Sequence, residues 1–313
     1  MPLSVATSKK LVGVWPDVLT PLQPDLSIDL PKLSSHIRNL AVKGVEHVTL
    51  FGYAGEGASF AADEKLDALA YLLKSGVGGE DILLGVHASS LVDVVRLIQQ
   101  AHALGVRRFL VSPPLYYQPL SQGALFDFFE QVIVKVNLPG WLLYVHVLGG
   151  VSHADVPEAV LKDLHRVHPL IMAGIVDQDP HASHTLDLMR SFGADLVVTS
   201  CHEPNLQILK PMGAVSALAN LIPGVVKHVL AQDMPVQTTK MSGMKVRQPD
   251  ERILELMTLL GDHPPITALK FLLSQHYHLA DWEHVRPPQG RLNAQAREAL
   301  MKLFKTFNVL PSE

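Results

Sequence analysis

Short runs rich in valine, isoleucine and leucine alternate along this chain with longer stretches of helical periodicity. Such alternation is typical of parallel strands joined by crossover helices, and it predicts an α/β fold. Leu66, Leu69, Ala70 and Leu73, for example, recur on one face of a predicted helix, as a helix that covers a sheet requires. Eight runs are predicted to be strands: 11–15, 45–50, 82–86, 109–112, 141–146, 170–175, 195–200 and 214–217.

The number of predicted strands decides between two α/β architectures. Eight strands suit a closed (β/α)8 TIM barrel, whereas a doubly wound dinucleotide-binding sheet carries a G-x-G-x-x-G turn after its first strand. That turn is absent from this sequence. We therefore predict a (β/α)8 barrel over residues 1–230 and, from three later helical stretches, a C-terminal helical extension over 231–313 packed on the barrel.

Composition narrows the possible partners of such a barrel. Of the 313 residues, 48% are hydrophobic and 18% are charged, so the chain can bury a large core. The formal charge is −4, and the sequence contains no stripe of basic residues interleaved with aromatics, the pattern that binds a nucleic acid backbone. We therefore expect no binding to nucleic acid. The apolar runs are short, and the start at Met1 lacks a secretory signal pattern, so we also expect no membrane binding and a cytoplasmic location. Cys201 is the single cysteine, which excludes an intrachain disulfide.

The residues just after each strand deserve the closest reading, because the active sites of α/β barrels lie at the carboxyl ends of the strands. The glycines of the segment 52–57 would let backbone N–H groups approach an anion such as a carboxylate, although a tight turn explains them equally well. Tyr116 and Tyr117 lie on a proline-stiffened loop, where phenols could relay protons or seal an interface. Tyr144 could point into the barrel mouth or serve packing alone.

These same segments carry a family resemblance. Residues 52–56 resemble a G-T-T-G-E motif, and Tyr116-Tyr117 and Leu143-Tyr144 resemble P-Y-Y and L-Y-N motifs. Residues 213–220 resemble a G-x-I-S segment at the eighth strand. The motifs follow one another in the family's order, and the resemblance extends from about Val12 to Phe307. The chain is therefore identified as a member of the dihydrodipicolinate synthase and N-acetylneuraminate lyase family. The resemblance implies a barrel fold, a small 2-oxo acid as ligand, and a homodimer or homotetramer in which a tyrosine of the P-Y-Y loop crosses to the neighbour.

The resemblance breaks at the residue that carries the family's chemistry. Members bind a 2-oxo acid as an imine on a lysine within a G-I-K-D/E pattern, and here that position is Val176, between Ile175 and Asp177. Valine cannot form an imine. Tyr53 and Ala54 stand where the family has threonines, the second of which belongs to its proton relay. The arginine that follows the L-Y-N motif in the synthase branch is also missing.

The resemblance nevertheless assigns a set of site residues. Tyr144 and Tyr117 are the candidate catalytic groups, and no cofactor is expected. The candidate substrate-binding residues are Gly52, Tyr53, Ala54, Gly55, Glu56, Val176 and Val215. With the imine-forming lysine gone, we expect a bound anion to lie at the N–H groups of 52–56 or at protonated histidines.

Three functions remain open on this sequence. The first is a divergent lyase that acts on a small oxo acid or related carbonyl compound without a Schiff base. The second is a catalytically silent ligand-binding or regulatory paralogue. The third is a metal-dependent aldolase or hydrolase, because His87, His146 and His202 follow or end alternate predicted strands and three imidazoles could bind Zn²⁺. Asp177, His181 and Glu203 are further candidate ligands for such a metal.

Overall fold

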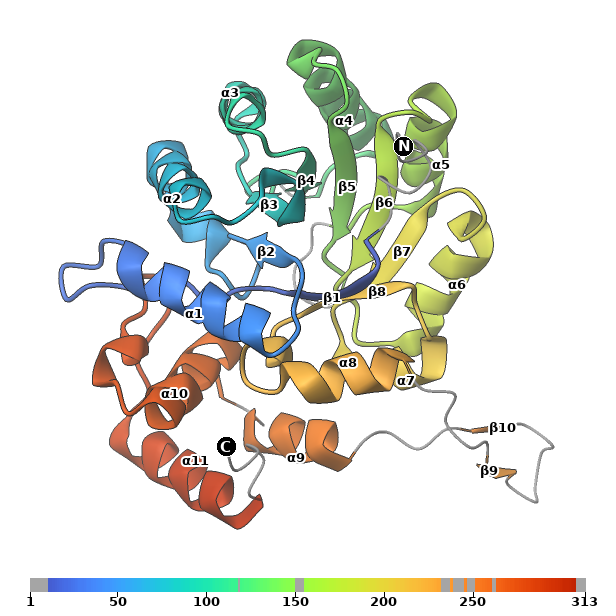
Figure 1. Cartoon of the computed structure of the whole chain (residues 1–313). Coiled ribbons are helices and arrows are strands. Elements are labelled where there is room, and N and C mark those ends of the chain that lie inside the picture. Colours follow the sequence, from blue (N-terminus) through green and yellow to red (C-terminus); the bar gives the residue numbers. More distant parts are fainter. Residues whose placement is uncertain are drawn as a thin grey trace.

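The fold is given by a computed structural model that describes residues 11–117, 119–149, 155–231, 237–238, 245–246, 251–260 and 263–307. Eight parallel strands form one sheet in the order β1-β8-β7-β6-β5-β4-β3-β2 (Figure 1). A parallel bridge between Asp17 and Thr49 joins β1 to β2 and closes the sheet into the predicted (β/α)8 barrel. The strands are β1 Gly13–Pro16, β2 Val48–Leu50, β3 Ile82–Val86, β4 Arg108–Val111, β5 Leu142–Val147, β6 Met172–Asp177, β7 Val197–Ser200 and β8 Gly213–Ser216.

Each of the eight predicted strands is present, with ends displaced by up to three residues. The largest displacement is at β2, which begins at Val48 although the apolar run begins at Val45. The Val45 N–H donates to the carbonyl of Leu40, within α1, after a turn at Gly44 with φ +81°. Val45 thus completes the end of a helix, because a positive-φ glycine followed by such a bond is a common helix stop.

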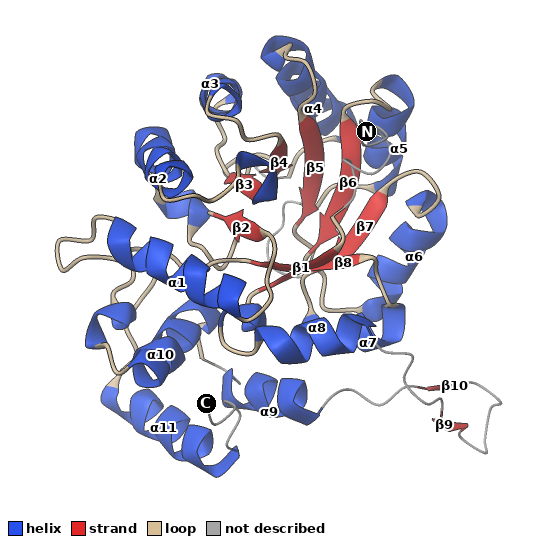
Figure 2. Cartoon of the chain, viewed as in Figure 1, coloured by secondary structure: helices blue, strands red, loops and turns tan. Residues whose placement is uncertain are grey.

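Helices cover the outside of the barrel (Figure 2). Several begin at capping side chains: Asp29 accepts from the Lys32 N–H, and Ser90 and Ser121 accept from N–H groups three residues on. Their apolar faces and the outer faces of the strands form the main core. The wall helices are α1 Leu30–Val42, α2 Ala62–Lys74, α3 Leu91–Ala103, α4 Gln122–Val136, α5 Glu158–Val167, α6 Ala182–Phe192, α7 Glu203–Leu209 and α8 Pro223–Ala231.

The C-terminal helices pack beside α8 and the strands β1 and β8 (Figure 1). Leu256, Leu269 and Leu272 share one hydrophobic cluster with Leu19 and Val226 of the barrel. This shared cluster supports the predicted packing of an extension on the barrel, and the boundary at residue 231 stays a prediction. The elements beyond α8 are β9 Gln237–Thr238, β10 Lys245–Val246, α9 Glu251–Leu260, α10 Pro265–Tyr277 and α11 Ala294–Phe307.

Short 3₁₀ helices complete the described chain. They are η1 Gly57–Ser59, η2 Gly79–Asp81, η3 Leu218–Asn220 and η4 Ala280–Glu283. Within the described ranges, none of the helices has the length and apolar character needed to cross a membrane.

Candidate active site

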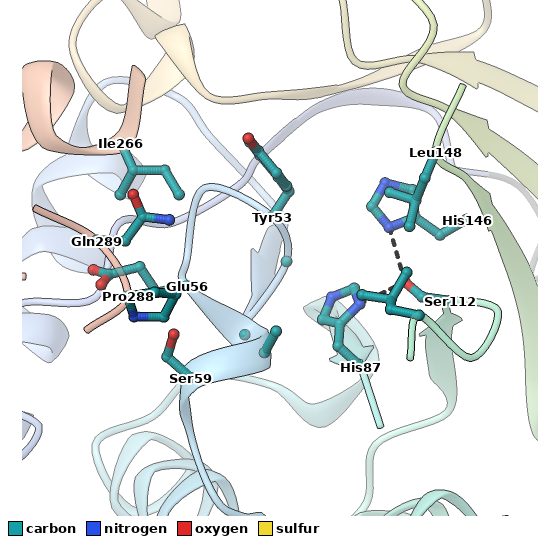
Figure 3. A pocket seen from close by; sticks show the side chains of 14 residues that line it. Tyr53, Glu56, Ser59, His87, Ser112, His146, Leu148, Ile266, Pro288 and Gln289 are labelled. Carbon is teal, nitrogen blue, oxygen red and sulfur yellow. Dashed lines mark hydrogen bonds between the residues drawn. The ribbon is translucent and has the colours of Figure 1, made fainter. Parts of the chain in front are cut away.

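A cavity of about 300 Å³ lies at the carboxyl ends of β2 to β5. One wall is the segment 52–59 that follows β2, together with residues brought in by the C-terminal extension. The opposite wall comes from the ends of β3, β4 and β5 (Figure 3). The lining residues are Gly52, Tyr53, Glu56, Gly57, Ala58, Ser59, His87, Ser112, Leu115, His146, Leu148, Ile266, Pro288 and Gln289.

The strand-end wall carries a chain of hydrogen bonds. Ser112 Oγ lies 2.5 Å from His87 Nδ1 and 3.2 Å from His146 Nδ1, so one hydroxyl connects two imidazoles (Figure 3). His146 Nε2 lies 3.3 Å from Gln178 Oε1. Because a hydroxyl has one proton, Ser112 can donate to one ring while it accepts from the other. The arrangement can therefore pass a proton between the two rings.

Both imidazoles are uncharged at neutral pH. Burial lowers the pKa of His146 to about 4, against a raising effect of the Gln178 hydrogen bond. Burial, with a smaller repulsion from His146, holds the pKa of His87 well below its ordinary value. A hydrogen bond with the Phe51 backbone acts on this pKa in the opposite direction, and His87 Nε2 is fully buried. The prediction that protonated histidines could anchor an anion is therefore wrong for this pair, because desolvation disfavours the imidazolium.

The N–H groups of the glycine-rich segment 52–57 are bonded to a side chain of the protein itself. Asp17 Oδ2 accepts the Ala54 N–H at 2.7 Å, and Asp17 Oδ1 accepts the Gly55 N–H at 3.3 Å. The Gly55 carbonyl in turn accepts from Thr20 Oγ1 at 2.8 Å. The N–H groups that we expected to hold a ligand anion are thus bonded to a carboxylate of the protein, and that expectation is corrected.

Glu56 lines the cavity but is tied back to the C-terminal extension. Its Oε1 accepts from Lys270 Nζ in a fully buried ion pair, and its Oε2 accepts the Arg286 N–H at 3.0 Å. Arg286 also donates to both carboxylate oxygens of Glu64 at 2.8 Å. The extension therefore fixes the segment 52–59 by charged hydrogen bonds, which are stronger than neutral ones.

Three of the predicted site residues lie inside the barrel. Tyr144, Val176 and Val215 are at most 3% exposed and belong to one interior cluster, and the cavity lining does not include them. Val176 is in register with His146 on β5. Burial raises the pKa of the Tyr144 phenol, while Arg108 hydrogen-bonds to it and acts in the opposite direction. Arg108 begins β4, so this contact is toward the amino ends of the strands. The catalytic role of Tyr144 stays a prediction.

The second predicted catalytic tyrosine lies outside the cavity as well. Tyr116 is 82% exposed and Tyr117 is 68% exposed, with ring centroids 5.2 Å apart in an edge-on arrangement. Their neighbour Leu115 is the residue of this loop that lines the cavity. A role for Tyr117 in this chain's own cavity finds no support in its position, whereas an interface would use its exposed ring.

The third histidine does not join the other two. Within the described part of the chain, no group of three or more His, Cys, Asp or Glu side chains is placed so that it could hold a metal ion. His202 precedes α7, where it marks the helix start, and His87 and His146 meet through Ser112 instead. Asp177 bonds to His184 and Thr185, and Glu203 bonds to Ser216. The arrangement therefore does not favour the metal-dependent alternative.

Several residues of this site were given no role from the sequence. Asp17 and Ser112 directly follow β1 and β4, so their position at strand ends was a signal that could have identified them. Ile266, Pro288 and Gln289 were not predicted to lie at the site, because only the folded extension brings them to the cavity.

Comparison with known proteins agrees with this architecture. The model of the dihydrodipicolinate synthetase family matches residues 10–307. A 4-hydroxy-tetrahydrodipicolinate synthase of Chlamydia trachomatis is 29% identical over 94% of this chain and 95% of its own. A 2-dehydro-3-deoxy-phosphogluconate/2-dehydro-3-deoxy-6-phosphogalactonate aldolase of Saccharolobus solfataricus is 22% identical over 91% and 92%. The crystal structure of dihydrodipicolinate synthase from Agrobacterium tumefaciens superimposes with a TM-score of 0.84 at 26% identity, covering 95% of this chain and 99% of the other.

Proposed function

Because the chain belongs to the dihydrodipicolinate synthetase family, we propose that it is a lyase that acts on a small oxo acid or related carbonyl compound without a Schiff base. The observation that carries the proposal is the His87–Ser112–His146 chain on the cavity wall. Bond cleavage beside a carbonyl requires proton transfer and stabilisation of the developing enolate oxygen. Two imidazoles joined by a hydroxyl can supply both.

The neutral state of the rings suits this role. A neutral imidazole N–H can donate a hydrogen bond to a carbonyl oxygen and polarise it, while an unprotonated ring nitrogen accepts a proton. A proton that one ring takes from a substrate can be balanced through Ser112, which receives a proton from that ring and passes its own proton to the other ring. The cavity of about 300 Å³ matches the lower end of the range of small-molecule sites.

The absence of a Schiff base is expected from the position of Val176. Its side chain is fully buried in the barrel interior, and the described lining residues include no lysine. Treatment with pyruvate and borohydride should therefore leave the mass of the protein unchanged. A pyruvyl adduct on any lysine near the barrel mouth would contradict this part of the proposal.

Turnover can be tested with a panel of small oxo acids, hydroxy aldehydes and hydroxy ketones in D₂O, followed by NMR for carbon–carbon cleavage and for hydrogen exchange beside the carbonyl. We expect Ser112→Ala to lower the rate by about 10²–10⁴-fold, because it breaks the proton path. Ser59→Ala is the matched control, since Ser59 lines the same cavity outside the histidine chain. Equal rates in the two variants would refute the assigned role of Ser112.

A catalytically silent binding protein is the second candidate. The observations that favour it are the valine in place of the family's imine-forming lysine and the carboxylate of Asp17 on the glycine-rich segment. The same panel separates the candidates, because a silent paralogue would show saturable ligand binding by NMR and no cleavage or exchange with any compound.

A further inference from the structure

Asp17 occupies a position that the surrounding chain holds firmly. It directly follows β1, and its N–H donates to the carbonyl of Ser216 at 2.9 Å. Its own carbonyl accepts from Asn220 Nδ2 at 2.8 Å. The residue is 6% exposed, so both its backbone and its carboxylate belong to the interior of the barrel mouth. The direction of the carboxylate is therefore a built feature of the fold.

The segment that receives this carboxylate has an unusual backbone. Phe51 and Glu56, on either side of it, have φ of 55° and 56°, in the left-handed region that non-glycine residues seldom adopt. Between them the Ala54 and Gly55 N–H groups converge on Asp17. A Cβ atom on Gly52 would lie 2.4 Å from Asp17 Oδ1, so this position requires glycine. Converging N–H groups of this kind form a concave anion site.

The cavity lies beside this position: Gly52 lines it, whereas Asp17, Ala54 and Gly55 do not. The described lining residues include neither arginine nor lysine, and Glu56 contributes a carboxylate that is already bonded to Lys270 and Arg286. The two imidazoles on the opposite wall are neutral because burial lowers the pKa of both. A ligand carboxylate would lose its hydration here without a charged hydrogen bond in return.

We propose that Asp17 is a specificity-determining residue: its carboxyl group fills the anion position of the segment 52–55, so the site takes small uncharged carbonyl compounds instead of carboxylate-bearing ones. That the ligand contains a carbonyl group rests on the proposed function, and that the ligand is uncharged rests on the position of Asp17. It narrows the substrate to an aldehyde, ketone or amide-bearing carbonyl compound. Its tests measure binding alone, so they can succeed even if no turnover is found.

The first test uses the wild-type protein and a pair of ligands that differ in charge. Pyruvate and pyruvamide have nearly the same shape, and their dissociation constants can be measured by ligand-observed NMR or calorimetry. We expect pyruvamide to bind at least about tenfold more tightly than pyruvate. Equal or tighter binding of pyruvate would overturn the proposal.

The second test asks whether an external carboxylate can replace the internal one. In Asp17→Ala the N–H groups lose their partner, so sodium formate should raise the melting temperature in a saturable way, compared with sodium chloride at equal ionic strength. Asp17→Asn is the matched control, because its side chain still fills the position and should give no such response. The wild-type protein should behave like Asp17→Asn.

If Asp17→Ala does not fold in sodium chloride, the yield of soluble, folded protein is compared in sodium formate and sodium chloride, and formate should raise it. A formate effect of the same size in wild type, Asp17→Asn and Asp17→Ala would overturn the proposal, as would a folded Asp17→Ala protein without any response. Loss of fold in both salts, combined with tighter binding of pyruvate than pyruvamide by the wild type, would overturn it as well.

Discussion

The two walls of the cavity differ in the kind of hydrogen bonds that hold them. On the wall of residues 52–59, the N–H groups of Ala54 and Gly55 are bonded to Asp17, and the carboxylate of Glu56 is bonded to Lys270. On the strand-end wall, two neutral imidazoles share one hydroxyl, and His146 is also bonded to the neutral amide of Gln178. The first wall is thus fixed by charged groups of the protein, whereas the second holds the groups that can transfer a proton.

The largest effect should come from breaking the first wall. Lys270→Met leaves the buried carboxylate of Glu56 without its cation, and removal of one partner of such a pair typically costs about 3–5 kcal/mol in the free energy of unfolding. Urea unfolding followed by circular dichroism measures this loss.

A surface pair provides the control for that measurement. Lys162 and Glu158 form an ion pair on α5 with side chains that are 58% and 41% exposed. Lys162→Met should therefore cost about 0–1 kcal/mol. A loss below about 1 kcal/mol for Lys270→Met would show that the extension does not stabilise the segment 52–59 through this pair.

The second prediction compares the two walls by pH. Burial raises the pKa of Asp17 from 3.8 to about 7, so the folded protein holds this proton more tightly than the unfolded chain, and the group's contribution to stability falls as pH rises from about 4 to 7. Burial lowers the pKa of His146 from 6.5 to about 4, so its contribution is lost as pH falls through the same window.

Replacing the two groups should therefore change the pH dependence in opposite directions. Asp17→Asn should make the free energy of unfolding rise more steeply with pH between about 4.5 and 6.5, and His146→Gln should make it rise less steeply. Each change in slope should reach up to about 1.4 kcal/mol per pH unit. Denaturant unfolding at five pH values measures the slopes, and changes of the same sign would contradict the assigned burial of one of the groups.

The smallest effect concerns assembly on the strand-end side. Tyr116 and Tyr117 are exposed beside the loop residue that lines the cavity, and we expect them to lie in the interface of a homodimer or homotetramer. Tyr117→Ser should weaken association by about 1 kcal/mol or more, measured by sedimentation or light scattering. Val42→Ser on α1, where the side chain is 88% exposed, is the control. A wild-type mass of 34.3 kDa at micromolar concentration would contradict the prediction.

The fold was predictable because its signals are local. The run at 82–86 coincides with β3, and the apolar face of Leu66, Leu69 and Leu73 lies on α2 as expected. The site was predictable only in part: Tyr53 and Glu56 line the cavity, but Tyr144 and Val176 lie in the barrel interior. Strand alternation places a side chain inside or outside the barrel, and it does not say how near the mouth that side chain ends.

The sequence by itself determined the eight strands and the prediction that Val176 takes the place of an imine-forming lysine, because periodicity and residue type do not depend on distant contacts. The tertiary structure decided which groups remain available to a ligand. Asp17 and Ala54 are 37 residues apart, and Lys270 and Glu56 are 214 apart, so these pairs exist only once the barrel closes and the extension docks. A hydrogen bond between distant segments leaves no periodic trace in the chain, and for that reason the filled anion position and the histidine chain became visible only in the folded protein.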